Sequence, residues 1–346
     1  MPEPGQLVRY GWTEAVSHSY TTYSGTPARV VRVDRGSCDV VTPSDFRKVR
    51  ATGVCTGDWV TVSDTDVVDV LPRRGTIARA AVSGRSETQV LAANVDLVGI
   101  VCPLEGDSAR QLRTQVDLAR IERLLALGWE SGAQPVVILT KADTADDPDA
   151  VVAEVEAVAP GAQVLAVSAA TGTGVDTLTE LIRGTIVLLG ASGAGKSTLA
   201  NALAGSAAMS TGAVRDVDGK GRHTTVHREL IPLPSGGALI DTPGLRGVGI
   251  MDAEDGIELA FRDVEELAQQ CRFDDCAHVA EPGCAVLAAI ADGRIPQRRL
   301  ASYHKLMREN AWAAARSDAR LAAERTRTHK AQSRALRNMY KVKGRK

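Results

Sequence analysis

The most constraining feature of the sequence is the segment 190–197, which reads Gly-Ala-Ser-Gly-Ala-Gly-Lys-Ser. It follows the apolar run TIVLLG and opens the expected helix KSTLANAL, and this strand–loop–helix context is typical of a phosphate-binding P-loop. Its glycines let backbone N–H groups turn towards phosphate oxygens, and the helix N-terminus adds its positive dipole end. We expect Lys196 to reach the outer phosphates of a nucleotide and the Ser197 hydroxyl to bind Mg²⁺. The residues expected to contact the nucleotide here are Gly190, Ala191, Ser192, Gly193, Ala194, Gly195, Lys196, Ser197 and Thr198.

Two motifs after the P-loop are expected to sense the third phosphate. Asp241-Thr-Pro-Gly244 follows the apolar run ALI, where a carboxylate can hold Mg²⁺ through water and the Gly244 N–H can contact the terminal phosphate. Between this motif and the P-loop lies GRHTT, in which a threonine can close on Mg²⁺ in the manner of GTPase switch segments. The spacing leaves both Thr224 and Thr225 open as the ligand, with a slight preference for Thr225.

A guanine-reading pair precedes the P-loop in the chain. Thr140-Lys141-Ala-Asp143 ends the apolar run PVVILT, and an aspartate there can accept both N1–H and N2–H of guanine. Adenine has no matching pair of donors, so Asp143 would select GTP over ATP. Lys141 can lie along the base. Ser168-Ala169, after the run AQVLAV, would place a backbone N–H on guanine O6.

The order of these motifs is unusual, because common P-loop GTPases carry the phosphate motifs before the guanine motifs. The site of an open α/β sheet is assembled at strand ends, so the order of strands in space need not follow the chain. We therefore predict an α/β fold with a circularly permuted P-loop GTPase domain, in which helices cover both faces of a parallel sheet. The permutation also connects the segment after Gly244 to the C-terminal helices, so a switch movement can reach them.

Length and local pattern divide the 346 residues into four expected parts. Residues 1–26 are rich in Ser, Thr and Gly and are expected to form a flexible N-terminus. Short strands separated by turns predict a small barrel, and an OB-type barrel fits residues 27–85. The permuted GTPase domain is expected over 86–250. A helical zinc-binding domain with a basic tail is expected over 251–346.

Three of the six cysteines cluster with one histidine near the C-terminus. Cys271, Cys276, His278 and Cys284 supply three thiolates and one imidazole, a closed set that is typical of a structural zinc site. Ordinary buried cysteines beside a surface histidine are the alternative, which so short a spacing disfavours. We expect one Zn²⁺ that contributes to the folding of this region. The scattered cysteines are expected to be small core residues: Cys38, Cys55 and Cys102.

The charge distribution points to nucleic acid. A net charge of −1 hides a C-terminal segment from Gly293 with 16 Lys and Arg against three acidic residues, a net +13. We expect this tail and the barrel residues Arg47, Lys48 and Arg50 to contact RNA, although a solvated helical tail is the alternative. No run approaches the roughly 20 apolar residues of a membrane span, and the N-terminus lacks the pattern of a signal peptide. Both absences predict a cytoplasmic protein without membrane contact, and nothing suggests more than a monomer.

The order of the motifs, GRHTT, DTPG and the cysteine cluster resemble the RsgA family, the ribosome small-subunit-dependent GTPases. The resemblance covers about residues 27–310, and LPRRGTIAR with the pair Asn94 and Asp96 resembles the family's join between barrel and GTPase domain. It implies a protein that binds the maturing small ribosomal subunit and its rRNA, hydrolyses GTP there in late assembly, and then leaves. One departure is Thr140, where the family has Asn; the shorter side chain would weaken base binding, while Asp143 keeps the specificity.

The hydrolysis step has one candidate catalytic residue. Ras-like enzymes orient water with a glutamine after DxxG, and Leu245 at that position predicts slow intrinsic hydrolysis. His223 is the nearest imidazole in sequence, and the resemblance also implies it as catalytic; a solvent-facing loop histidine is the alternative. Two other functions remain open. They are a P-loop ATPase, if the guanine motif is accidental, and a non-catalytic rRNA-binding module with a structural nucleotide.

Overall fold

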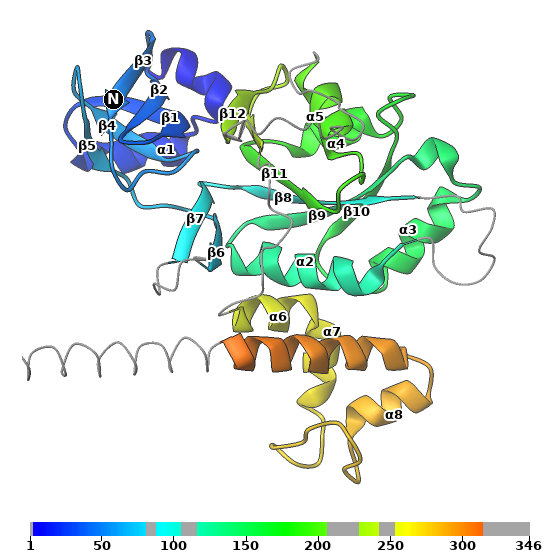
Figure 1. The fold of residues 1–346 in the computed structure, drawn as a ribbon. Coiled ribbons are helices and arrows are strands. Elements are labelled where there is room, and N and C mark those ends of the chain that lie inside the picture. Colours follow the sequence, from blue (N-terminus) through cyan, green and yellow to red (C-terminus); the bar gives the residue numbers. More distant parts are fainter. Residues whose placement is uncertain (1–2, 81–87, 105–115, 206–227, 242–252, 314–346) are drawn as a thin grey trace, which may run out of the picture.

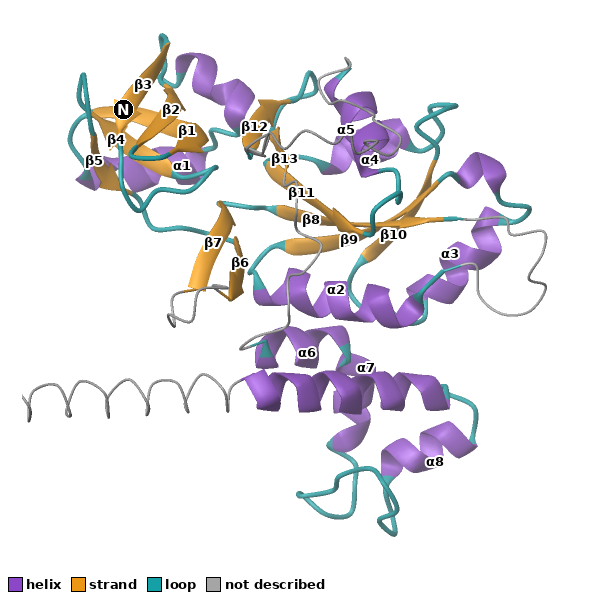
Figure 2. Cartoon of the chain, in the orientation of Figure 1, coloured by secondary structure: helices purple, strands orange, loops and turns teal. Residues whose placement is uncertain are grey.

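The computed structural model describes residues 3–80, 88–104, 116–205, 228–241 and 253–313. These residues form an N-terminal barrel, a central α/β sheet and a C-terminal group of helices (Figure 1). Figure 2 shows that strands dominate the first part and helices the last. The predicted succession of an all-β part, an α/β part and a helical part is therefore confirmed.

A closed barrel of five strands forms the N-terminal part. β1 pairs with β2 and β4, β2 pairs with β3, and β4 pairs with β5, all antiparallel. A parallel bridge between Arg50 and Asp66 brings the end of β3 to β5, which closes the ring as in an OB-type barrel. Valine, alanine and cysteine side chains fill its interior, as expected for a chain with only 3% aromatic residues. The strands are β1 (Thr26–Asp34), β2 (Ser37–Val41), β3 (Phe46–Arg50), β4 (Trp59–Val62) and β5 (Val67–Val70).

Short helical turns precede the barrel, within the segment that the composition predicts to be flexible. Leu7 and Tyr20 are buried there, and the rings of Trp12 and Trp59 pack edge to face with centroids 5.4 Å apart. These aromatic contacts hold the segment against β4. No local periodicity in the sequence predicts them. The elements are η1 (Gly5–Tyr10), α1 (Glu14–Ser19) and η2 (Tyr20–Thr22).

The central sheet has the strand order β10-β9-β8-β11-β13-β12 and continues through β1 into the barrel. The first five strands run parallel, and β12 runs antiparallel to β13. β11 therefore lies between a strand from earlier in the chain and a strand from later in it, which confirms the permuted order. The strands are β8 (Leu97–Pro103), β9 (Gln134–Thr140), β10 (Gln163–Val167), β11 (Thr185–Gly190), β12 (Glu229–Pro232) and β13 (Ala238–Asp241).

Helices cover both faces of this sheet (Figure 1). Val187 and Leu189 of β11 belong to the cluster with α2 and α3, whereas Ile186 and Leu188 belong to the cluster with α4 and α5. This alternation confirms the predicted parallel sheet between two helical layers. No helix among the described residues combines the length and apolar character that a membrane crossing requires. The elements are α2 (Leu118–Glu130), η3 (Ala142–Thr144), α3 (Pro148–Glu156), α4 (Val175–Leu181) and α5 (Lys196–Ala204).

A separate hairpin of β6 (Thr76–Ala80) and β7 (Thr88–Ala93) follows the barrel and leads into β8. The predicted boundary between residues 85 and 86 falls inside this hairpin, at positions outside the described residues. The boundaries between the four predicted parts remain predictions.

The C-terminal helices dock on α2. Gly256 lies so close to this helix that a Cβ atom there would be 2.2 Å from the Ala126 carbonyl oxygen. Arg299 and Glu122 are both fully buried and form an ion pair of 3.0 Å, and Arg299 also pairs with Asp263 at 2.7 Å. The helical part is therefore fixed to the half of the sheet that carries β8 and β9. Its helices are α6 (Glu254–Ala260), α7 (Arg262–Ala268), α8 (Ala285–Ala291) and residues 297–313.

Candidate functional site

The carboxyl ends of the parallel strands meet at one edge of the sheet. Thr140 at the end of β9 aligns with Pro103 of β8 and Val167 of β10, and Gly190 at the end of β11 aligns with Val101 of β8. Asp241 ends β13, the neighbour of β11 on its other side. The predicted phosphate and guanine motifs, which come from separate parts of the chain, therefore share this edge.

The P-loop joins β11 to α5 with the geometry that its glycines predict. Gly193 and Gly195 have φ angles of 80° and 84°, a region that favours glycine. A Cβ atom at Gly190 would lie 2.2 Å from the Val101 carbonyl oxygen, so no other residue fits there. The Lys196 ammonium donates hydrogen bonds to the carbonyl oxygens of Gly190, at 3.0 Å, and Ala191. The ammonium thus lies over the loop, where a bound phosphate would replace these neutral carbonyl oxygens as its acceptor.

Thr140 ties the guanine motif to the P-loop. Its side chain is buried, and its hydroxyl donates a 2.7 Å hydrogen bond to the Ala194 carbonyl oxygen. Gly195 follows directly, and a Cβ atom there would approach the Thr140 hydroxyl to 3.3 Å. Although threonine is shorter than the asparagine usual in the family, the Thr140 side chain therefore still reaches the P-loop.

The two guanine segments also contact each other. The Ser168 hydroxyl donates a 2.5 Å hydrogen bond to Asp143 Oδ1, and Ser168 is buried. Lys141 adopts a left-handed conformation with φ of 60°, which turns the chain at the end of β9. Together with the contact between Thr140 and Ala194, this bond links three of the segments expected to hold one nucleotide: the P-loop, Thr140–Asp143 and Ser168–Ala169.

Several predicted site residues cannot be placed. His223, Thr224, Thr225, Gly244 and Leu245 lie outside the described residues, as does the side chain of Asp241. Ser197 and Thr198 form the first turn of α5 with Lys196. The individual roles of all these residues remain predictions.

We expect Thr140→Val to lower the affinity for GDP and GTP about tenfold, because the buried Ala194 carbonyl would lose its donor. Titration with a fluorescent GDP analogue measures this change. Thr140→Ser keeps the hydroxyl and should bind nearly as the unmodified protein does. Equal affinities of the valine and serine variants would show that the link has no part in binding.

The four predicted metal ligands converge in the C-terminal part. Their ligand atoms all lie within 4.8 Å of one another, with 3.8 Å between the sulfurs of Cys271 and Cys284. His278 Nδ1 lies 3.6 Å from the Cys271 sulfur and 3.4 Å from the Cys284 sulfur. A tetrahedral zinc ion with bonds of about 2.3 Å to sulfur and 2.0 Å to nitrogen implies edges of about 3.8 and 3.5 Å. The cluster, which Cys276 completes, therefore fits zinc.

Backbone donors and one carboxylate shape the loops around this cluster. The N–H groups of Ala285 and Leu287 donate to the sulfurs of Cys271 and Cys284, both at 3.4 Å. Hydrogen bonds from its own backbone N–H and from those of Val279, Ala280 and Ala277 lower the pKa of the Glu281 carboxyl to about 2. The loop around the cluster is thus held in place by its own hydrogen bonds.

The three isolated cysteines are buried, as expected. Cys38 lies inside the barrel, and Cys102 lies in the core beneath α2. Burial raises the pKa of the Cys55 and Cys102 thiols to about 12, and that of Cys38 to about 11. They are protonated packing residues at neutral pH.

A buried polar joint between barrel and sheet contains residues that belong to no sequence motif. The Asn94 amide donates to the Gly57 carbonyl oxygen at 2.9 Å and accepts from the Arg74 N–H at 3.1 Å. Asp96 accepts a 2.7 Å hydrogen bond from the Thr185 N–H at the start of β11. Asn94 and Asp96 were noted only through the family resemblance, because single polar residues carry no local pattern.

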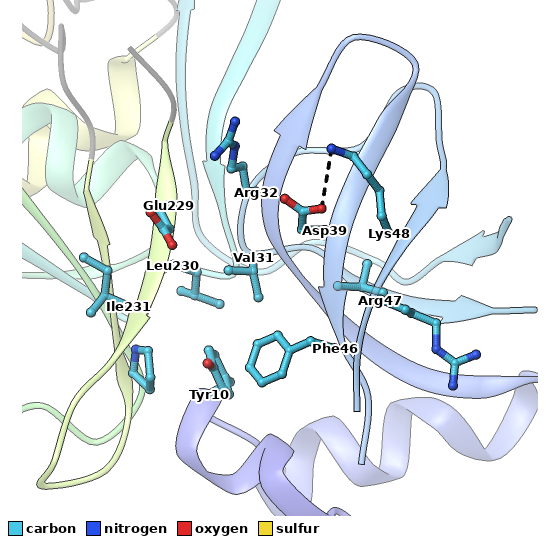
Figure 3. A pocket seen from close by; sticks show the side chains of 12 residues that line it. Tyr10, Val31, Arg32, Asp39, Phe46, Arg47, Lys48, Glu229, Leu230 and Ile231 are labelled. Carbon is cyan, nitrogen blue, oxygen red and sulfur yellow. Dashed lines mark ion pairs between the residues drawn. The ribbon is translucent and has the colours of Figure 1, made fainter. Parts of the chain in front are cut away.

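A groove of about 550 Å³ runs between η1, the face of β1–β3 and β12 (Figure 3). Phe46 is 58% exposed at its edge, next to Arg47 and Lys48. Lys48 pairs with Asp34 at 2.6 Å and with Asp39 at 3.7 Å, and Arg47 pairs with Asp45 at 2.8 Å, so much of the positive charge is balanced. Strands 2 and 3 form the face on which OB-type barrels bind oligonucleotides. The groove is lined by Tyr10, Val31, Arg32, Asp39, Val40, Phe46, Arg47, Lys48, Glu229, Leu230, Ile231 and Pro232.

Comparison with known proteins assigns the chain to a family. The model of the RsgA GTPase family matches residues 70–251. The chain belongs to the RsgA GTPase family. One member, the small ribosomal subunit biogenesis GTPase RsgA of Streptomyces coelicolor, is 53% identical over 94% of this chain and 92% of its own length. The protein of the same name from Xanthomonas axonopodis pv. citri is 49% identical over 77% and 72%.

Solved structures show the same architecture. YjeQ from Thermotoga maritima superposes with a TM-score of 0.61 and 26% identity, covering 82% of this chain and 98% of that one. YloQ, described as a circularly permuted GTPase, superposes with a TM-score of 0.58 over 86% and 98%, and at 23% identity it supports the fold alone. This RsgA family member therefore has the permuted fold that its motif order predicts.

Proposed function

We propose that this protein is a GTPase that acts in late assembly of the small ribosomal subunit. It binds the maturing subunit, hydrolyses GTP to GDP and phosphate in response, and then leaves. Family membership supports the proposal, as does the name carried by relatives that match nearly the whole chain, small ribosomal subunit biogenesis GTPase. The single observation that carries it is the meeting of the P-loop and the guanine motif at one sheet edge, joined by the bond between Thr140 and Ala194.

In the proposed complex, each side of the nucleotide is read by a different segment. Asp143 accepts the two guanine N–H donors, Lys141 lies along the base, and the Ala169 N–H donates to guanine O6. The backbone of Gly190–Gly195 and the N-terminus of α5 hold the phosphates, with Lys196 on the outer ones. The Ser168 hydroxyl supports this assignment, since it holds Asp143 in place from the next strand.

Mg²⁺ neutralises charge on the outer phosphates when it is bound with GTP. We assign its ligands to Ser197, to Thr225 or Thr224, and to Asp241 through water. One Zn²⁺ has a structural role at the cysteine cluster, because four protein ligands leave no open position for substrate.

The barrel and the C-terminal tail are the proposed rRNA contacts. Phe46 offers an exposed ring for stacking with an unpaired base, and Arg47 and Lys48 follow it on β3, where the Arg47 side chain extends away from the ring (Figure 3). The basic tail from Arg294 would add phosphate contacts, so subunit binding should weaken strongly with salt. We further propose that the protein acts as a monomer in the cytoplasm and contacts no membrane.

The test is GTP turnover with and without purified small ribosomal subunits. We expect slow turnover by the protein alone, clear stimulation by small subunits, and none by large subunits at the same concentration. Competition by GDP but not ADP checks the nucleotide. Displacement by ADP would favour the ATPase alternative, and turnover that no subunit stimulates would favour an RNA-binding module with a structural nucleotide.

His223→Ala should lower the stimulated turnover about a hundredfold, the lower end of what a general base contributes. GDP affinity, measured on the same variant, should be unchanged. His18→Ala, at an exposed histidine of α1, is the matched control. Stimulated turnover that survives the change at His223 would remove this residue from the mechanism.

A further inference from the structure

Arg29, on barrel strand β1, is a buried cation at the joint between the barrel and the central sheet. Its side chain is 1% exposed. It donates a 2.6 Å hydrogen bond to the hydroxyl of Thr185, the first residue of β11. It also donates to the carbonyl oxygens of Tyr10, Gly57 and Asn94. One guanidinium thus connects the barrel, the segment before it and the strand that leads to the P-loop.

No carboxylate among the described residues forms an ion pair with this guanidinium. Its carbon instead lies 4.5 Å from the ring centroid of Trp59. Burial lowers the pKa of Arg29 to about 10, and the more distant Asp96 and Asp58 offset only part of that effect. A buried charge with neutral partners costs more free energy than an apolar side chain in the same space. Holding the barrel against the sheet would therefore not require an arginine. Fixing one orientation of the barrel relative to β11 would, because the guanidinium bonds several acceptors in defined directions.

The strand that begins at Thr185 gives this contact a route to the nucleotide. The Thr185 N–H donates to Asp96, so the start of β11 is held from two sides. β11 spans about 17 Å at roughly 3.3 Å per residue and is paired with β8 and β13. Its last residue, Gly190, lies against the Val101 carbonyl oxygen without room for a methyl group. A displacement of Thr185 would therefore move the start of the P-loop.

The two appendages of the sheet hold different halves of the proposed site. The barrel contacts the phosphate half through Arg29 and through the pairing of Arg32 with Glu229 on β12. The C-terminal helices contact the other half, where Arg299 binds Glu122 of α2. A partner that binds both the barrel and the C-terminal part can thus shift the phosphate half and the guanine half of the proposed site independently.

We infer that Arg29 is a positioning residue of GTP hydrolysis, which acts through the Thr185 hydroxyl to set the P-loop when the barrel is bound to the ribosomal subunit. The inference rests on the proposed function, since it names how subunit binding reaches the nucleotide. It concerns the stimulated reaction, because Arg29 belongs to the barrel, which the proposed function places on the subunit.

The test is Thr185→Val in the full-length protein, which removes the hydroxyl and leaves the other acceptors of Arg29 in place. We expect the ratio of subunit-stimulated kcat to intrinsic kcat to fall about tenfold, as the loss of one hydrogen bond to a charged group implies. Subunit affinity, measured by co-sedimentation, should not change. Thr185→Ser should restore the ratio. Thr61→Val is the matched control, because Thr61 is equally buried and its hydroxyl bonds Asp69 within the barrel.

Arg29→Lys is the second variant, because an ammonium keeps the charge but cannot reach the same set of acceptors. Melting curves confirm that each variant folds. The inference would be overturned if both folded variants kept the ratio of stimulated to intrinsic kcat. It would also be overturned if the variants lost affinity for the subunit while the stimulated kcat stayed unchanged. A wild-type protein that small subunits fail to stimulate would refute the proposed function, and this inference with it.

Discussion

Replacing Asp143 with asparagine is expected to lower the affinity for GTP about a thousandfold and to let xanthosine triphosphate bind in its place. The carboxylate matches two N–H donors of guanine, whereas an amide presents its own N–H₂ to one of them. Xanthine carries a carbonyl where guanine carries an amino group, so it accepts that N–H₂. The effect should be large because the hydrogen bond from Ser168 fixes the orientation of the side chain at this position.

Competition between a labelled diphosphate and unlabelled GDP or xanthosine diphosphate measures the reversal. Asp149→Asn is the matched control, because Asp149 is an exposed carboxylate in the first turn of α3. It should keep the preference for guanine. An Asp143 variant that still prefers guanine would contradict the assignment of this residue to the base.

Loss of the metal is the second large effect expected. Cys271→Ser should abolish zinc binding and unfold the loops between α7 and α8, because a structural zinc ion contributes about 10 kcal/mol or more to folding. Metal analysis should find one zinc per chain in the unmodified protein and none in the variant. Hydrogen exchange should then rise across residues 271–291, while the barrel stays protected.

Cys38→Ser is the matched control, because this cysteine is buried in the barrel, far from the cluster in sequence. It should keep its zinc. Thiol labelling gives a second readout: chelation should expose the three clustered cysteines, while burial keeps Cys38, Cys55 and Cys102 protonated and protected. Helices α7 and α8 that remain protected after the metal is removed would contradict a structural role.

The sequence predicted the features that local pattern encodes. The P-loop lies between β11 and α5 as its strand–loop–helix context requires, and the apolar runs before Asp143 and Ser168 form β9 and β10. The order of the motifs was enough to predict the permutation, because a nucleotide site requires these strand ends to meet. The metal cluster was predictable for the same reason, since its four ligands lie within one short segment.

The joints between the parts were not predictable. Arg29 and Thr185 are 156 residues apart, and Glu122 and Arg299 are 177 apart, so no local periodicity connects them. The Ser, Thr and Gly content of the first 26 residues predicts flexibility. It does not indicate that aromatic rings in this segment pack on Trp59, because that contact is tertiary. The reach of Thr140 to the P-loop also depended on a tertiary distance that its side-chain length alone does not give.

The position of β11 between β8 and β13 also affects how the chain is synthesised. β8, β9 and β10 leave the ribosome before β11 and β13, and β11 begins 82 residues after β8 ends. At roughly 5–20 residues per second, translation leaves the apolar edge of β8 without its partner for about 4–16 s. An unpaired apolar edge strand is a template for aggregation. The permutation therefore makes the nascent chain of this protein depend on protection of that edge until β11 emerges.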